Sequence, residues 1–166
     1  MATVSQQLDV GAAQFLSSAF PALVKNGTNF PAVGLAYDAA AVEAAFWLIR
    51  AISYGSGNVT VALDWYADAA TSGDVVWLVQ LAAITPDTDS QDVETKSLAT
   101  ANSVTDTHLG TTGQRLHRAM VTVSNLDSLA ANDDLWMRIA RDATNGSDSM
   151  TGDAILVAAT VSYSDT

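Results

Sequence analysis

The chain has 166 residues, 49% of them apolar, and its 18 acidic and 7 basic residues give a formal net charge of -11. One domain of this length buries roughly two thirds of the surface of its unfolded chain, so the composition excludes a disordered protein, and no apolar run reaches the roughly 18 residues of a membrane span. The acidic excess excludes a nucleic-acid-binding surface, and the absence of cysteine excludes disulfides and thiolate metal sites.

The first 28 residues differ in composition from the rest of the chain, because glutamines and serines lie among irregularly spaced apolar residues. Two interpretations stay open: an N-terminal arm that becomes ordered on a partner, or an extra strand or helix of the same domain. If the segment is an arm, its anchors are apolar: Leu8, Val10, Phe15, Leu16 and Phe20. It has no positively charged start followed by an apolar stretch, so we expect no secretory signal.

Residues 29–166 contain short apolar runs separated by turn residues, which is typical of an all-β domain. The run Val59–Trp65 alternates between apolar and more polar residues, so its odd-numbered side chains are expected to face a core. The alanine-rich segment 37–46 also supports a short helix. Eight strands are predicted, over residues 31–37, 43–52, 58–67, 74–84, 95–101, 116–123, 135–141 and 154–164.

Sixteen of the eighteen acidic residues are aspartates, which favour turns and are depleted from strands and helices. Eight strands joined by aspartate-rich turns predict an eight-stranded antiparallel jelly-roll sandwich, because two sheets folded over one core limit exposed edges. An immunoglobulin-like sandwich is the alternative, since strand number does not determine connectivity.

Large aromatic residues in the expected strands are predicted to pack in the core. The alternative is that one or two tryptophans, with Tyr54 or Tyr66, form a sugar-stacking platform or a subunit contact. The four tryptophans are Trp47, Trp65, Trp77 and Trp136.

No residue pattern indicates catalysis, a metal or a cofactor. His108 and His117 lack metal-ligand spacing, and a glycosidase needs two carboxylates at a defined separation that spacing along the chain does not show. The aspartate-rich segments 87–94 and 142–148 offer oxygen ligands for calcium, but neither has the EF-hand pattern, so we expect ordinary Asx turns. We therefore expect no catalytic residues, no metal site and no cofactor.

Four short motifs occur in order along the expected domain: W-x-A-D at 65–68, G-D-V-x-W at 73–77, R-x-x-R-D at 138–142 and G-D-A at 152–154. This order resembles small jelly-roll proteins of tailed bacteriophage particles, over roughly residues 43–164. Members of that group serve as capsid decoration (cement) proteins or as modules of tail appendages.

The resemblance implies a non-enzymatic virion protein, most like a decoration protein that sits on the capsid surface and is made in the host cytoplasm. It would bind the major capsid protein through the 1–28 arm, form a homotrimer, and contact neither nucleic acid nor membrane. The basic group Arg115, His117 and Arg118 is the candidate subunit interface, or else a solvated strand edge. The alternative is a tail-fibre or appendage module that binds host-surface glycans through Tyr54, Tyr66 or Asp89.

Overall fold

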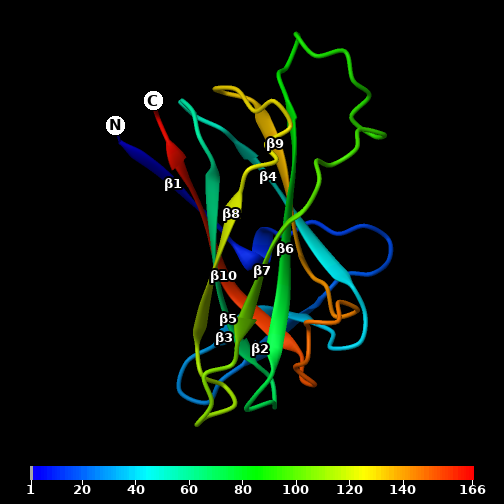
Figure 1. Ribbon diagram of the computed structural model, residues 1–166, viewed down its shortest axis with the longest axis vertical. Helices are drawn as coiled ribbons and strands as arrows, with labels where there is room; N and C mark the ends of the chain where they lie inside the picture. Colours follow the sequence, from blue (N-terminus) through cyan, green and yellow to red (C-terminus); the bar gives the residue numbers. More distant parts are fainter. Residues whose placement is uncertain (1) are drawn as a thin grey trace.

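Period-two alternation of apolar side chains gives most of the strands one face that packs on a shared core. The computed structural model describes residues 2–166, and these form ten strands and one short 3-10 helix (Figure 1). The elements are β1 (Thr3–Leu8), η1 (Val10–Ala12), β2 (Ala22–Asn26), β3 (Ala32–Tyr37), β4 (Glu43–Arg50), β5 (Val59–Ala67), β6 (Asp74–Ile84), β7 (Asn102–Thr107), β8 (His117–Val123), β9 (Asp134–Arg141) and β10 (Ala154–Ser164).

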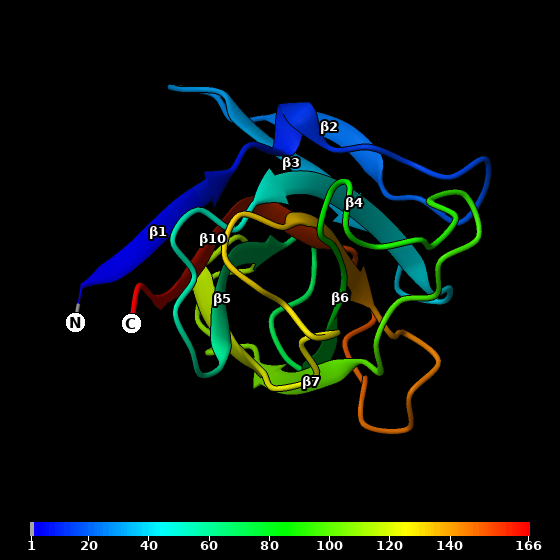
Figure 2. The same ribbon diagram turned by 90° about the horizontal axis from the view of Figure 1, so that it is seen from above.

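The strands form two antiparallel sheets that enclose one core (Figure 2). Sheet A has the order β2-β3-β10-β5-β8, with β1 also paired to β10, and sheet B has the order β4-β9-β6-β7. The orders β3-β10-β5-β8 and β4-β9-β6-β7 are those of a jelly roll. The predicted all-β sandwich is therefore confirmed, and the immunoglobulin-like alternative is wrong.

The structure has ten strands where eight were predicted. The two additional ones lie in the 1–28 segment, for which the two interpretations were an arm and an extra element of the same domain. The arm is not confirmed, because β1 pairs with β10 from Thr3↔Ser164 to Leu8↔Ala159 and β2 pairs with β3. The reason lies in β10, whose first half pairs with β3 only from Ala154 to Leu156. Without β1, the second half of that edge would leave its backbone groups unpaired.

Two further local predictions need correction. The predicted strand 95–101 is part of the β6–β7 connection, and the strand that pairs with β6 is the polar segment Asn102–Thr107. β7 was not predicted from the sequence because this edge strand has Val104 as its single large apolar residue. The alanine-rich segment 37–46 contains no helix: Asp38 accepts a hydrogen bond from the Ala41 backbone in a turn, and β4 follows.

Three of the four tryptophans pack in the core, as predicted. Trp47, Trp65 and Trp77 are at most 3% exposed, and the rings of Trp65 and Trp77 meet edge to face with centroids 6.2 Å apart. Trp136 points the other way, to the outer face of sheet B, and is partly exposed. Within residues 2–166, no helix has the length and apolar character needed to cross a membrane.

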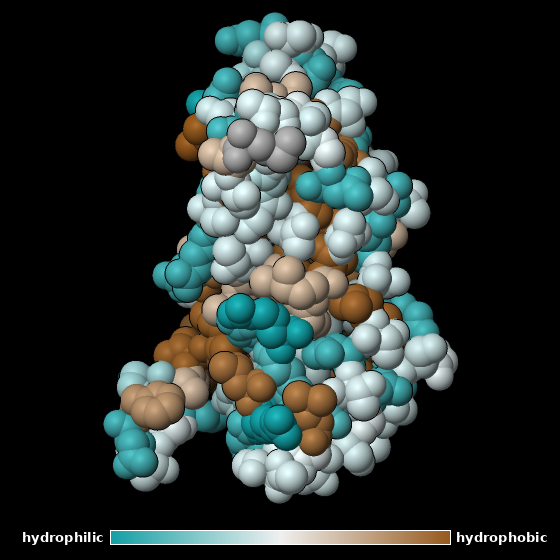
Figure 3. All heavy atoms as spheres, turned by 60° about the vertical axis from the view of Figure 1, so that its left-hand side comes forward, coloured by the Kyte–Doolittle hydropathy of each residue, from teal (hydrophilic) through white to brown (hydrophobic). Residues whose placement is uncertain are grey.

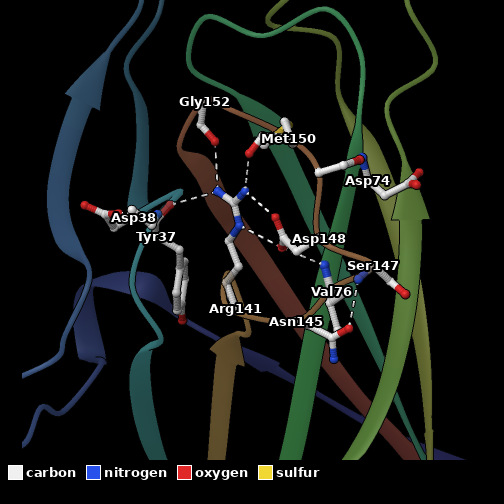
Figure 4. Close-up of polar contacts among 12 residues, drawn as sticks. Tyr37, Asp38, Asp74, Val76, Arg141, Asn145, Ser147, Asp148, Met150 and Gly152 are labelled. Carbon is white, nitrogen blue, oxygen red and sulfur yellow. Dashed lines mark hydrogen bonds and ion pairs between the residues drawn. The ribbon is translucent and has the colours of Figure 1, made fainter.

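The aspartate-rich connection between β9 and β10 is organised around Arg141, which is fully buried (Figure 4). Its Nε and Nη2 donate to the two carboxylate oxygens of Asp148 at 3.0 and 2.8 Å. It also donates to the carbonyl oxygens of Met150 and Gly152 at 2.7 and 2.8 Å. Asp148 accepts a further bond from the Val76 backbone at 3.0 Å, so this loop is tied to sheet B.

The same loop was considered for calcium and for Asx turns. The carboxylate of Asp148 is already occupied by Arg141, and Asn145 accepts a bond from the Ser147 backbone at 3.0 Å, which is an Asx turn. Across residues 2–166, no three acidic or histidine side chains gather in a way that would hold a metal ion.

Candidate binding groove

The outer face of sheet B presents two cross-strand rows that differ in chemistry. The register places Arg138 of β9 between Phe46 of β4 and Gln80 of β6. In the neighbouring row, Trp136 lies between Leu48 and Ala82. Because directly paired residues have Cβ atoms about 5 Å apart, the side chains of each row are close neighbours across the three strands.

One side of this face is walled by the segment that follows η1. Gln14 exchanges two backbone hydrogen bonds with Phe46, at 2.8 and 2.9 Å, which holds the segment against the edge of β4. Phe15 and Leu16 continue this wall.

The opposite wall is the β6–β7 connection, which contributes Val93, Lys96 and Leu98. Figures 1 and 2 show this green connection and the blue segment after η1 projecting on the same side of the molecule. The two walls and the strand rows enclose a groove of about 430 Å³. We call it the sheet B groove.

The β6–β7 wall is fastened to the sandwich at several points. Gln80 donates from its amide to the Ala99 carbonyl at 2.9 Å, and Ala99 donates from its backbone to Leu81 at 2.8 Å. Lys96 forms an ion pair with Asp127 at 2.8 Å. These contacts order the wall without a ligand, so little conformational entropy has to be lost when one binds.

Trp136 and Phe46 give the groove partly exposed aromatic rings on a sheet, which is a rigid support. Arg138, Gln14 and Lys96 supply polar groups beside these rings. A mainly apolar groove with a few convergent polar groups is the usual form of a small-molecule site. Rings next to hydrogen-bonding groups suit a ligand that is apolar on its faces and polar at its edges.

Arg138 is the unusual residue of the groove floor, because it is half-buried and its one side-chain hydrogen bond goes to a neutral group. Its Nη1 donates to Oε1 of Gln80 at 2.7 Å. Burial lowers the pKa of the Arg138 guanidinium, while Tyr37 and Asp142 raise it. A guanidinium nevertheless remains charged at any ordinary pH.

The predicted arm anchors divide into two groups. Leu8 and Val10 lie in the core, where they are 2% and 7% exposed. Phe15 and Leu16 are 42% and 66% exposed and line the sheet B groove, and the Phe20 ring lies against Phe15 with centroids 5.5 Å apart. The structure therefore uses this segment to complete its own sandwich and groove.

The basic group that was considered as a subunit interface is not a uniform exposed patch. His117 is 4% exposed and stacks on Trp65, with ring centroids 4.6 Å apart. Arg118 forms two hydrogen bonds with the carboxylate of Asp64, at 2.6 and 2.7 Å. Arg115 is exposed beside them. The subunit role of this group stays a prediction.

The side chains predicted for glycan binding are engaged elsewhere. Tyr54 is 8% exposed and donates to the Gly57 carbonyl at 2.6 Å, and Tyr66 is 7% exposed. Asp89 accepts a bond from the Thr85 backbone at 2.8 Å and so shapes the β6–β7 turn. Trp136 was predicted only as one of four tryptophans, and its groove partners were not predicted. The even-numbered alternation of β4, β6 and β9 is the sequence signal that indicates them.

A second hollow, of about 790 Å³, lies on the outer face of sheet A. Figure 3 looks toward this side of the molecule and shows apolar side chains gathered in its lower half. The hollow is larger than the sheet B groove, but the Tyr66 ring at its floor is buried and its hydroxyl already accepts a bond from Asn26 at 3.1 Å. Phe30, at 75% exposed, projects from the rim. The sheet B groove therefore offers the better aromatic platform.

No family model and no curated protein matches the chain. Among solved structures, it is similar to the CBM36-1 domain of a multidomain xylanase from the hindgut metagenome of Trinervitermes trinervoides, at 9% identity, TM-score 0.46 and coverage of 95% of this chain and 96% of that one. It is also similar to CBM28, a non-crystalline cellulose specific carbohydrate-binding module, at 14% identity, TM-score 0.48 and coverage of 90% and 84%. A third is the family 11 carbohydrate-binding module from Clostridium thermocellum, in complex with a mixed-linked tetrasaccharide, at 5% identity, TM-score 0.47 and coverage of 96% and 87%.

The prediction of a capsid decoration protein is corrected. Its proposed attachment required a free N-terminal arm, whereas Leu8 and Val10 are core residues and β1 is a strand of sheet A. The solved structures reported above are carbohydrate-binding modules.

Proposed function

We propose that this domain is a glycan-binding module whose site is the sheet B groove. The observation that carries the proposal is the partly exposed Trp136 on the floor of a preformed groove, next to Arg138 and between two walls. A sugar ring has apolar C–H faces and a polar edge of hydroxyl groups. It would place a face on the indole ring while its hydroxyls meet Gln14, Lys96 and Arg138.

The proposed activity is binding without turnover. The side chains that line the groove include no carboxylate in the part of the chain that the structure describes. Hydrolysis of a glycosidic bond needs two carboxyl groups on opposite sides of the bond. The groove instead offers rings and hydrogen-bond donors, which orient a sugar but do not cleave it.

The phage resemblance supplies a setting for this activity. Glycan recognition is the role of a tail-fibre or appendage module, and it needs a groove of the kind that sheet B presents. We therefore propose host-surface glycans as the ligand source and a virion appendage as the location. A homotrimeric state belongs to the same proposal, because several weak sites on one appendage would bind a sugar-covered surface with avidity.

The test is binding of the full chain to an array of microbial and host surface glycans, with Trp136→Ala as the variant. Trp136→Ala is expected to weaken binding at least about 10-fold, since the residues that dominate a binding site are enriched in tryptophan and cost about 2 kcal/mol when truncated. Phe30→Ala is the matched control, because it removes an exposed aromatic ring from the rim of the sheet A hollow.

Each result has a defined meaning. Loss of binding in Trp136→Ala but not in Phe30→Ala supports the sheet B groove. The reverse pattern would move the site to sheet A. If the unmodified protein binds no glycan on the array, the proposed function is wrong.

A further inference from the structure

The seven lysines and arginines of this acidic chain divide by whether they have a carboxylate partner. Four have a carboxylate partner within 4.0 Å: Arg50 with Asp134, Lys96 with Asp127, Arg118 with Asp64, and Arg141 with Asp148. Within residues 2–166, the other three, Lys25, Arg115 and Arg138, have none. Lys25 and Arg115 are exposed, so water solvates their charge, whereas Arg138 is half-buried at the floor of the sheet B groove.

A partly desolvated charge without a counter-charge is unfavourable, and the cost rises when a ligand displaces the remaining water. A neutral sugar offers Arg138 hydroxyl oxygens as hydrogen-bond acceptors but no counter-charge. An anionic group supplies both, and hydrogen bonds between oppositely charged groups are about twice as strong as neutral ones.

The donor geometry of Arg138 narrows the choice of anion. Its Nη1 is used by Gln80 at 2.7 Å. Its Nε and Nη2 make no hydrogen bond to any other residue in the described chain, and neither is sealed from solvent. These two nitrogens form one edge of the planar guanidinium, and that edge matches the two oxygens of a carboxylate.

Building on the proposed function, we infer that the ligand of the sheet B groove is an acidic glycan, whose sugar carboxylate is bound by Arg138 while a neighbouring ring stacks on Trp136. The two residues are two positions apart on β9, so they lie on the same face at a spacing of about 7 Å. Lys96 adds a second positive charge to the wall, although Asp127 largely neutralises it.

The net negative charge of the molecule works against unselective binding of acidic glycans. At a net charge of -11, the chain repels polyanions at long range, so unselective capture of acidic polymers is not expected. Affinity for an acidic sugar must therefore come from local contacts, and the groove is a place where cations line a cavity and carboxylates do not.

The experiment titrates the full chain with short oligosaccharides of galacturonic, mannuronic and glucuronic acid and with sialylated oligosaccharides. Each acidic sugar is paired with its carboxyl-reduced counterpart, which has the same backbone without the charge. We expect at least one acidic member to bind at least about 10-fold more tightly than its reduced counterpart. This comparison needs only the unmodified protein.

Arg138→Gln then tests the assignment to one residue. It is expected to reduce affinity for the acidic sugar at least about 10-fold and to affect the reduced counterpart much less. Arg118→Gln is the control, because it makes the same change in net charge on the outer face of sheet A. An equal loss in Arg118→Gln would show a bulk charge effect and would overturn the inference.

Equal binding of acidic and reduced sugars overturns the inference and leaves the proposed function intact. Binding of a sulfated, carboxyl-free glycan as tightly as the acidic sugar overturns the assignment to carboxylate. Absence of binding to every member of the panel and of the glycan array overturns the inference together with the proposed function.

Discussion

Arg138 and Arg141 lie three residues apart on β9, and the chain surrounds them in opposite ways. Arg141 is fully buried, points inward and has its guanidinium hydrogen-bonded to a carboxylate and to backbone carbonyls (Figure 4). Arg138 points outward into the sheet B groove and bonds to the neutral amide of Gln80. The charge of Arg141 is thus paired inside the fold, whereas Arg138 has no carboxylate within 4.0 Å in the described chain and only the more distant influence of Asp142.

This contrast separates a structural role from a binding role. A buried charge that is fully hydrogen-bonded fixes the loop around it, and removing it leaves its partners unsatisfied. A half-buried charge with free donors contributes little to the fold, and its donors are available to a ligand. Substitution of the two arginines should therefore produce opposite effects on stability and on binding.

The largest effect is expected for Arg141→Met. Loss of the guanidinium leaves Asp148 as an uncompensated buried charge, so the free energy of unfolding should fall by about 3–5 kcal/mol. Urea denaturation at neutral pH measures this change. Arg138→Met is the matched control and should change the unfolding free energy by less than about 1 kcal/mol. Similar losses in both variants would contradict the contrast.

A double-mutant cycle sharpens the same point. Asp148→Asn alone should be destabilising, because it leaves the buried Arg141 without its counter-charge. Once Arg141 has been replaced by Met, the same change should cost less, with a coupling free energy of about 1–3 kcal/mol. Denaturation of the two single variants and the double variant gives this value. Additive effects would show that the pair acts through its neighbours separately.

Two histidines repeat the contrast between paired and unpaired polar groups inside the core. His108 has both ring nitrogens in hydrogen bonds, at 2.9 Å to the Gly113 carbonyl and at 3.0 Å to the Gly110 backbone nitrogen. His117 lies against it, with ring centroids 4.6 Å apart, and neither of its ring nitrogens has a partner. Burial lowers the pKa of His117, His108 and Arg115 lower it further, and Asp106 opposes them.

The smallest effect is expected for His117→Phe. The unfolded chain gains a proton at His117 near pH 6.5, whereas the folded chain gains it at a lower pH, so this residue removes stability as pH falls from about 6.5 toward the folded pKa. Phenylalanine keeps the stacking on Trp65 and cannot titrate. At pH 7 the free energy of unfolding of His117→Phe should equal that of the unmodified protein or exceed it by up to about 1 kcal/mol. The variant should also lose less of this free energy on acidification.

Comparing His117→Phe with the unmodified protein separates the effect of His117 from that of groups whose titration stabilises the fold as pH falls. Burial raises the pKa of both Glu43 and Asp153, so these carboxyl groups favour the folded state on acidification. Both groups are present in each protein and cancel in the difference. Thermal denaturation of both proteins at several pH values between 5 and 7.5 measures this difference in stability. If the two plots of stability against pH are parallel, His117 does not titrate in this range.

Much of the fold was predictable because strong alternation marks strands that have one face on a core. The predicted bounds of β6 and β10 agree with the structure, and those of β5 and β9 differ by one residue. The prediction failed where pairing decides the outcome. β1 and β2 have weak patterns of their own and become strands because edges of β10 and β3 are available to them.

The groove was less predictable than the fold. Trp136 was identified only as one of four tryptophans, since alternation places side chains on two faces but does not show which face is covered. The cross-strand row of Phe46, Arg138 and Gln80 joins residues that are 34 to 92 positions apart in the chain. The register that brings them together depends on the pairing of three strands.

The sequence by itself determined the class of this protein: an acidic all-β chain without cysteine, whose apolar alternation and aspartate-rich turns favour a sandwich. Local patterns are sufficient for this, because they reflect backbone periodicity and turn chemistry within a few residues. Only the tertiary structure decided that residues 3–26 belong to the sandwich, that Arg141 is structural, and that Arg138 faces a groove. Those outcomes depend on burial and on contacts between residues that are distant in sequence, and such residues come together only in the folded chain.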